Sequence, residues 1–514
     1  MLSKKSYALI DVREKTEYNS GQILGATNVP RRELEFRLSQ LVPNKSTTII
    51  LYDNNDQRAR LAAETLQRNG YTNIHVLKGG LIAWQEAGNP LVEGVNVPSK
   101  IFGEIFASRT ELKEITPREL NEWQKRGEDL TIIEVRPPEE VEHSGSIPGA
   151  INIQGVELPL CIHDFLDQNK KIVITCAGRT RGFIATLTLK MMGIDVYDLQ
   201  NGTQGWVLSG FQLQKNIPAG IKPSPKSREK AKKFALQLKK ENNINLITPK
   251  ELIDLQQEKE NIYLCDVRTK EEYVSGHIPG SLCIPGGQAI QCADDFIAVR
   301  YSPIIFICDD MTRSIITAYW YKQMQYKNVF VLEGGLNQWR EMGGKLITGN
   351  NNSVPLGFEE ASKKVVKINA FSLKNELDNQ ANIYLIYVGN SREFQKGHLP
   401  GSIWLNRSFL EEKIKKIVSK EDKIIVTCKD GKNSILATAT LMDLGYQKVQ
   451  VLEGGTEAWM LSGLPLESGT SGIQGKADDF LPRSHERTPG EMIEYLNWEI
   501  NLHNDPLYTK ILDY

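Results

Sequence analysis

Short apolar runs alternate with segments of helical periodicity along the whole chain. The same pattern occurs four times, as TTIILYDNNDQRARLAAETLQ, KKIVITCAGRTRGFIATLTLK, PIIFICDDMTRSIITAYWYKQ and DKIIVTCKDGKNSILATATLM. Each version begins with a short aliphatic run typical of a fully buried strand. A polar loop follows, and then a segment with apolar residues at i, i+3, i+4 and i+7. Strands that alternate with helices at this spacing predict a parallel α/β sheet with helices on both faces.

Two further phrases repeat in step with these elements. KGGLIAW, QNGTQGW, EGGLNQW and EGGTEAW each follow a short strand, and LIDVREKTEY, IIEVRPPEEV, LCDVRTKEEY and LIYVGNSREF stand near the start of each copy. The period of roughly 120 to 130 residues is that of whole domains rather than of solenoid units. We therefore expect four domains over residues 1–97, 98–222, 246–350 and 351–468.

Two segments belong to no repeat. Residues 223–245 form a basic stretch that begins with prolines, and they are expected to make a linker helix between the second and third domains. The tail, residues 469–514, either packs back on the array or contacts another copy of the chain, so an oligomer through the tail stays open.

Composition narrows the class of protein. The chain has 514 residues, which is too long for one hydrophobic core, and its formal net charge of -1 gives no general affinity for nucleic acid or anionic membranes. No apolar run of about 18 residues predicts a membrane span, and the first residues carry no secretory signal. The 7 cysteines include no CxxC pair, which argues against a disulfide framework and a structural zinc site. A cytoplasmic protein is expected.

The repeated motifs resemble those of a known family. The combination DVR…EEY…GHIPG, a cysteine that ends a strand, and EGG…W resembles the rhodanese superfamily, and the whole chain resembles bacterial sulfurtransferases with four tandem rhodanese domains. The resemblance implies small domains with a central parallel sheet, each with its active cysteine in the loop after a central strand. It also implies transfer of sulfane sulfur through a cysteine persulfide.

The second domain has the most favourable loop for this chemistry. A cysteine between a strand end and a helix N-terminus receives loop N–H groups and partial positive charge, which lower a thiol pKa. Cys176 is the first choice of nucleophile, and two cations in its loop are expected to bind an anionic donor. The expected binding residues are Ala177, Gly178, Arg179, Thr180 and Arg181.

The other three loops depart from this pattern. Cys428 is the second candidate, with Lys429, Gly431 and Lys432 as binding residues, but Asn433 replaces the arginine of the family's CxxGxRS pattern and Tyr387-Val388-Gly389 replaces DVR. Cys308 is the weaker candidate, because Asp309 and Asp310 follow it and should raise its pKa, although Arg313 fits the pattern. Asp53 stands at the cysteine position of the first domain. A carboxylate cannot carry sulfane sulfur, so this domain is expected to be structural or interactive.

Loop length separates two branches of the family. Related phosphatases and arsenate reductases have a Cys-x5-Arg loop, whereas Cys176–Arg181 and Cys308–Arg313 have the Cys-x4-Arg length of the sulfurtransferase branch. The phosphatase alternative is therefore disfavoured.

Several recurring residues have structural explanations. The pairs Asp11/Arg13, Glu134/Arg136 and Asp266/Arg268 are expected to form ion pairs that brace the strand end. The tryptophans after the Gly-Gly turns are expected to anchor helices in the core, and the four remaining cysteines are expected to pack as small hydrophobes.

These observations predict a sulfurtransferase without cofactor or metal. A small anionic donor such as thiosulfate would load Cys176, and a thiol, cyanide or a cysteine of an acceptor protein would take the sulfur in a second half-reaction. Two alternatives stay open: a non-catalytic scaffold that binds partner proteins, and a relay that passes sulfur among Cys176, Cys308 and Cys428. No nucleic acid or membrane partner is expected.

Overall fold

A computed structural model describes residues 6–166, 170–258, 261–350, 353–379, 382–474 and 477–504. The chain divides into two compact units. One consists of residues 1–6, 96–351 and 482–514, and the other of residues 7–95 and 352–481. The units therefore pair the second domain with the third, and the first domain with the fourth.

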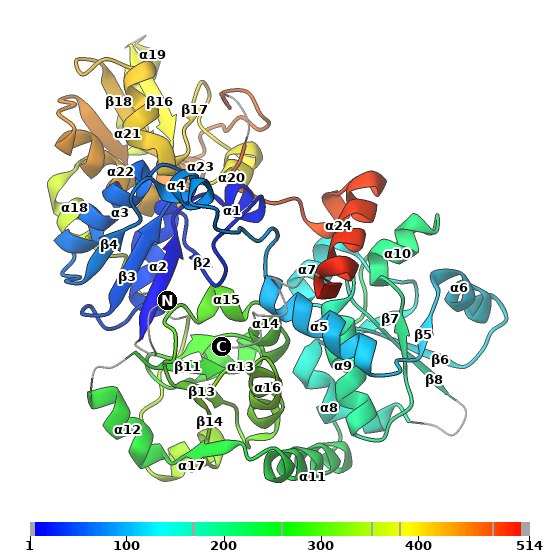
Figure 1. The fold of residues 1–514 in the computed structure, drawn as a ribbon. Coiled ribbons are helices and arrows are strands. Elements are labelled where there is room, and N and C mark those ends of the chain that lie inside the picture. The colour runs from blue at the N-terminus through cyan, green and yellow to red at the C-terminus, as the bar shows by residue number, and fades with distance from the viewer. Residues whose placement is uncertain are drawn as a thin grey trace. The chain divides into compact units, whose positions relative to one another are not determined.

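Each domain is built on one sheet of parallel strands (Figure 1). The first has the order β2-β1-β3-β4, and the others have the orders β5-β9-β8-β6-β7, β10-β14-β13-β11-β12 and β15-β19-β18-β16-β17. The strands of the first two domains are β1 (Tyr7–Asp11), β2 (Thr27–Asn28), β3 (Thr48–Tyr52), β4 (Ile74–Val76), β5 (Glu114–Ile115), β6 (Leu130–Glu134), β7 (Ala150–Asn152), β8 (Lys171–Thr175) and β9 (Tyr197–Leu199). Those of the last two are β10 (Asn245–Ile247), β11 (Tyr263–Asp266), β12 (Leu282–Cys283), β13 (Ile304–Ile307), β14 (Val329–Leu332), β15 (Val366–Ile368), β16 (Ile383–Tyr387), β17 (Ile403–Trp404), β18 (Lys423–Thr427) and β19 (Val449–Leu452).

Helices connect these strands. In the first two domains they are α1 (Lys15–Asn19), α2 (Leu34–Leu41), α3 (Gln57–Arg68), α4 (Gly80–Glu86), α5 (Val97–Arg109), α6 (Pro117–Lys125), α7 (Pro138–Ser144), α8 (Leu158–Cys161), α9 (Thr180–Met191) and α10 (Gly202–Leu208). Beyond them lie α11 (Pro225–Glu241), α12 (Pro249–Gln257), α13 (Lys270–Ser275), α14 (Gly286–Gln291), α15 (Ala293–Phe296), α16 (Thr312–Gln323), α17 (Gly335–Glu341), α18 (Phe358–Lys364), α19 (Ala370–Asp378), α20 (Ser391–Lys396), α21 (Leu410–Lys413), α22 (Lys432–Asp443), α23 (Gly455–Leu461) and α24 (Pro489–Asn501).

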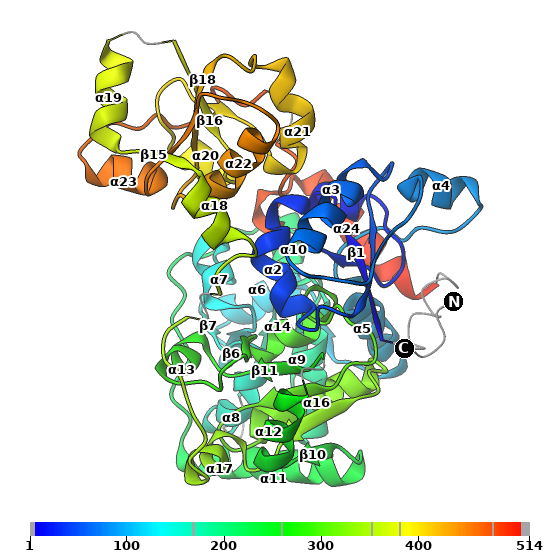
Figure 2. The ribbon, with the colours of Figure 1, turned by 90° about the vertical axis from the view of Figure 1, so that its left-hand side faces the viewer.

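The central strands are mostly apolar because both faces of each sheet are covered. In β18, Ile424 and Val426 belong to one core cluster with residues of α21 and α22, while Ile425 belongs to another with residues of α19 and α23. Figure 2 shows α19 and α23 on one side of this sheet, and α21 and α22 on the other. The predicted fold, four parallel sheets with helices on both faces, is confirmed.

Interfaces within the units join domains that are neighbours in space. The Trp320 Nε1–H of α16 donates to Thr188 Oγ1 of α9 at 3.0 Å, which joins the third domain to the second. Helix α11 packs on both α8 and α16 through a buried face of small residues that includes Ala231 and Ala235 (Figure 1). In the other unit, Arg407 of the fourth domain forms a buried ion pair with Glu35 of the first.

Most of the residues predicted to form ion pairs or to anchor helices have those contacts in the structure. Arg13, Arg136 and Arg268 each form an ion pair of 2.7 Å with the acid two residues before them, so the predicted brace is confirmed. Trp206, Trp339 and Trp459 are buried and anchor their helices. Trp84 is only partly buried, although its indole N–H donates to a carbonyl six residues later, as the other three do.

Part of the C-terminal tail packs back on the array. Helix α24 lies against α5 and α10 within the unit that holds the second domain (Figure 1). The final residues of the predicted tail, 505–514, and residues 1–5 of the first domain lie outside the described residues. The predicted contact between copies through the tail stays a prediction.

Candidate active site

The four nucleophile positions occupy the same place in the fold. Asp53, Cys176, Cys308 and Cys428 each directly follow a central strand (β3, β8, β13 or β18), and the loop that follows leads into α3, α9, α16 or α22. The main-chain oxygen of each accepts a hydrogen bond from the start of the helix after the Gly-Gly or Asn-Gly turn. A side chain on the second glycine would overlap this oxygen. In the fourth domain, a Cβ on Gly455 (φ +63°) would lie 2.2 Å from the Cys428 oxygen. The repeated glycine phrase therefore allows a close backbone approach that holds the loop.

In the fourth domain the loop donates to the sulfur. The backbone N–H of Ser434 donates to Cys428 Sγ at 3.4 Å, and Ser434 Oγ lies 3.4 Å from the same sulfur. Asp430 Oδ1 lies 3.8 Å from the sulfur. Burial raises the pKa of Cys428 to about 11; the Ser434 contacts oppose this rise and the Asp430 charge adds to it. The thiol is therefore the resting form at neutral pH, and its anion has donors in place.

A cavity of about 350 Å³ reaches Cys428. Lys429 and Asp430 line it and are exposed. Lys432 and Gly431, also predicted as binding residues, are not in its lining: Lys432 is exposed, and Gly431 (φ +88°) packs on the Gly-Gly turn. The first domain, which belongs to the same unit as the fourth, contributes Arg32 and Phe36 to this cavity. The lining consists of Arg32, Phe36, Val388, Gly389, Asn390, Glu393, Cys428, Lys429, Asp430, Asn433 and Glu457.

In the second domain the loop is covered. Helix α24 lies over it: Thr180 Oγ1 donates to Glu499 Oε1 at 2.8 Å, and Leu496 and Glu499 lie within 4 Å of the place where a Gly178 Cβ would be. Ala177, Gly178 and Thr180 are buried, as is Cys176. Burial raises the pKa of Cys176 to about 12, with Arg181 opposing the rise. The expectation of a lowered thiol pKa here is wrong, because burial outweighs the loop cations.

The two arginines of this loop already have acidic partners. Arg179 forms a two-point contact with Glu104 of α5, with N–O distances of 2.6 and 2.8 Å. Arg181 does the same with Glu140 of α7, at 2.7 and 3.1 Å. Both guanidinium groups were predicted to bind the donor; in this conformation each is neutralised by a glutamate. Sequence inspection missed Glu104 because it lies outside the repeated motifs.

The third domain has the same sulfur contacts as the fourth but a more closed loop. Ser314 N–H donates to Cys308 Sγ at 3.5 Å. Arg313 is buried against Glu272 and against Glu157 of the second domain. Burial is the largest cause of the raised pKa of Cys308, and Asp310 adds to it, as predicted. Asp309, in contrast, pairs with Arg268 and Arg313.

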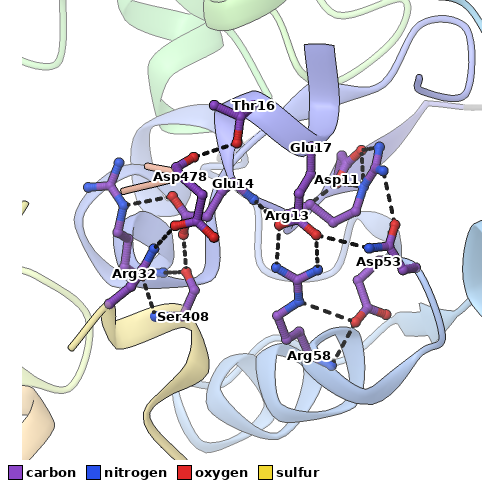
Figure 3. Close-up of polar contacts among 12 residues, drawn as sticks. Asp11, Arg13, Glu14, Thr16, Glu17, Arg32, Asp53, Arg58, Ser408 and Asp478 are labelled. Carbon is purple, nitrogen blue, oxygen red and sulfur yellow. Dashed lines mark hydrogen bonds and ion pairs between the residues drawn. The ribbon is translucent and has the colours of Figure 1, made fainter. Parts of the chain in front are cut away.

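In the first domain the Asp53 carboxylate forms a hydrogen bond across the loop. Asp53 Oδ2 accepts the backbone N–H of Arg58 at 2.9 Å, and the Arg58 guanidinium forms two bonds with Glu17 (Figure 3). Burial raises the pKa of Asp53. The loop that holds a thiol in the other domains here holds an oxygen acid, in agreement with a non-catalytic first domain.

Among the described residues, no group of three or more histidine, cysteine, aspartate or glutamate side chains is arranged to hold a metal ion. No helix in the described part of the chain is both long and apolar enough to cross a membrane.

Comparison with known proteins agrees with the geometry. The model of the rhodanese-like domain matches residues 1–87, 116–209, 248–342 and 370–462. The chain belongs to the rhodanese family. All four rhodanese-like matches contain one of the four loops described above.

One solved structure matches over the full length. The thiosulfate sulfurtransferase from Pseudomonas aeruginosa is 31% identical, with a TM-score of 0.92 over 100% of this chain and 97% of that one. Curated relatives match shorter stretches of the chain, such as 76 residues in one and 141 in another. The uncharacterized protein YqhL of Bacillus subtilis is 45% identical over 15% of this chain and 59% of its own length. The thiosulfate sulfurtransferase PspE of Escherichia coli is 34% identical over 16% of this chain and 78% of its own. The chain thus spans little more than half the length of the first curated relatives, 59% and 53%.

Proposed function

We propose that this protein is a sulfurtransferase that carries sulfane sulfur on Cys428. The observation that carries the proposal is the cavity of about 350 Å³ that reaches this cysteine, beside a backbone N–H aimed at its sulfur. Full-length similarity to a protein described as a thiosulfate sulfurtransferase supports the reaction class. The first choice of nucleophile therefore moves from Cys176 to Cys428, because the Cys176 loop lies under α24.

The reaction has two half-steps. The Cys428 thiolate attacks the outer sulfur of a donor such as thiosulfate; a new S–S bond forms, the donor's S–S bond breaks, and sulfite leaves with the electron pair. An acceptor thiolate or cyanide then attacks the outer sulfur of the persulfide, and the electron pair returns to Cys428 Sγ. The Ser434 N–H would stabilise the negative sulfur in both steps. Ping-pong kinetics are expected.

The remaining domains differ in their relation to this site. The first supplies Arg32 and Phe36 to the cavity, which gives a domain without a nucleophile a structural role. Sulfur loading of Cys176 would require α24 to leave its loop. A scaffold function and a relay among the three cysteines stay hypotheses.

Peptide mass spectrometry tests the proposal. The full-length protein is incubated with thiosulfate, freed of excess donor and digested under conditions that preserve persulfides. We expect one added sulfur on the Cys428 peptide, and loss of turnover in C428S but not in C176S. Turnover that survives in C428S, or a thiosulfate sulfur found only on Cys176, would overturn this assignment.

A further inference from the structure

Three of the four domains place two arginines at the rim of the loop. The first is the brace arginine, which pairs with the acid two residues before it: Arg13, Arg136 or Arg268. Arg13 Nη1 donates to Asn54 at 3.0 Å and Arg268 Nη1 to Asp309 at 3.3 Å, so in these two domains it reaches the residue directly after the nucleophile position. The second stands five residues after that position and binds a glutamate of α1, α7 or α13, the helix that follows the brace. The three pairs are Arg58–Glu17 at 2.6 Å, Arg181–Glu140 at 2.7 Å and Arg313–Glu272 at 2.6 Å.

The fourth domain has neither arginine. Gly389 and Asn433 stand at the two positions, and both line the cavity at Cys428. Tyr387 replaces the acid of the brace, and its ring occupies the space beside Gly389, where a Cβ would lie 2.6 Å from the ring. This ring packs on Phe394 in a buried aromatic cluster. The cavity therefore opens where the other domains hold guanidinium groups.

In the described part of the chain, no ion pair joins a guanidinium group to the glutamate that this second arginine would bind. Glu393 is the counterpart of Glu17, Glu140 and Glu272, and it lines the cavity. In those three glutamates burial is the largest single effect, but the arginine together with neighbouring charges and hydrogen bonds lowers the carboxyl pKa, for Glu140 to about 2. Burial instead raises the pKa of Glu393, with the charge of Lys429 and bonds from Asn390 opposing the rise and the charge of Asp430 adding to it.

The two cations that line the cavity have acidic partners. Arg32 pairs with Glu14 at 3.0 Å and Glu33 at 2.8 Å (Figure 3). Lys429 lies 3.6 Å from Glu457. With Glu393 and Asp430 also on the wall, the cavity is acidic.

We propose that the sulfur acceptor at Cys428 is a small thiol with a positively charged group, which Glu393 binds in the place that arginine fills in the other three domains. This inference rests on the proposed function and adds the chemical class of the acceptor. The acceptor thiolate attacks the outer sulfur of the Cys428 persulfide. An S–S bond forms to the acceptor, the bond to Cys428 Sγ breaks, and the electron pair stays on Sγ. The cationic group takes no part in the bond changes and positions the thiol.

Three thiols of similar size and different charge test the proposal. Cys428 is first loaded with thiosulfate or, if that donor fails, with a cysteine persulfide, and excess donor is removed. Single-turnover release of the sulfur is then followed with cysteamine, 2-mercaptoethanol and mercaptoacetate at equal thiolate concentrations. We expect cysteamine to react about five-fold faster than 2-mercaptoethanol, and mercaptoacetate to be slowest, from one charge interaction of about 1 kcal/mol, the value for two unit charges about 4 Å apart in water. Equal rates for the three thiols would overturn the inference.

Two variants assign the preference to Glu393. E393Q keeps the shape and removes the charge, so the advantage of cysteamine should disappear. N433R restores the guanidinium partner of the other domains and should reduce the advantage in the same way. E421Q, an exposed carboxylate elsewhere in the same domain, is the matched control and should keep it. Failure of both donors to load Cys428 would overturn the proposed function, whereas normal loading with no charge preference would overturn only the acceptor class.

Discussion

The carboxylate of Asp430 provides a sharp test of how the loop controls Cys428. Its Oδ1 lies 3.8 Å from the sulfur, and its charge contributes to the raised pKa of the thiol, which is about 11. The D430N substitution removes the charge. It keeps an Oδ1 that can accept the Lys432 N–H, which now donates to Asp430 Oδ1 at 3.0 Å.

The size of the effect follows from the distance and the exposure. Two unit charges about 4 Å apart interact by about 1 kcal/mol in water and about 4 kcal/mol near a protein surface. The Asp430 side chain is 44% exposed and lies 3.5 Å from Lys432 Nζ, so the lower value applies. A change of about 1 kcal/mol corresponds to a fall of roughly 0.7 in the Cys428 pKa.

Alkylation as a function of pH measures this change. Only the thiolate reacts, so its fraction and the rate rise with pH below the pKa and level off above about 11. Below the pKa, D430N should therefore react about five-fold faster than the unaltered protein at the same pH. Iodoacetamide labelling followed by peptide mass spectrometry reports Cys428, and the Cys176 peptide of the same digest is an internal control. An unchanged or slower Cys428 rate in D430N, with E421Q also unchanged, would refute this account of the loop electrostatics.

Three further predictions test other parts of the structure. G455A should prevent sulfur loading and lower the melting temperature sharply, because its Cβ would meet the Cys428 oxygen at 2.2 Å. The control G463A, at a glycine with φ +74° and no neighbour within 4 Å, should lower the free energy of unfolding by only about 1 kcal/mol. Equal losses of stability for the two variants in calorimetry would contradict the close-approach argument. L496D should weaken the packing of α24 and speed alkylation of Cys176 several-fold relative to the exposed-site control E494Q, and a rate equal to that control would show that the helix does not protect the thiol. R268L should leave the Asp266 carboxylate buried without its partner and destabilise the protein by about 3 to 5 kcal/mol in denaturant unfolding, and a loss below about 1 kcal/mol would show that the brace is not structural.

Much of the fold was predictable because it depends on local patterns. The apolar run KIIVT predicts a strand buried on both faces, and the structure places it at the centre of its sheet as β18. The brace arginines were predictable too, since each bonds to an acid two residues away. The packing of the first domain against the fourth could not be predicted, because it depends on contacts such as Arg407–Glu35 between residues hundreds of positions apart.

The candidate site shows the same division. The cysteines can be identified from the sequence, as can the departure of Gly389 and Asn433 from the family pattern. From the sequence alone, these changes made Cys428 a weaker candidate than Cys176. Their effect in three dimensions is to open the cavity. The glutamates that bind the loop arginines, Glu17, Glu140 and Glu272, could have been found, because they recur with Glu393 at one position of the second repeated phrase. Arg32 and Phe36 carry no such signal, since their role exists only at the interface of two domains.

The sequence by itself determined four parallel α/β domains, three of them with a cysteine at the end of the central strand and one without, because strand burial, helix periodicity and turn glycines act over a few residues. Only the tertiary structure decided which of these cysteines lines an open cavity. Cys176 and Cys428 lie in equivalent loops, but α24, more than 300 residues further along the chain, covers the first. A cavity with a wall from the first domain reaches the second. Access to a thiol depends on every segment packed around it, and these segments come from parts of the chain that no local pattern connects.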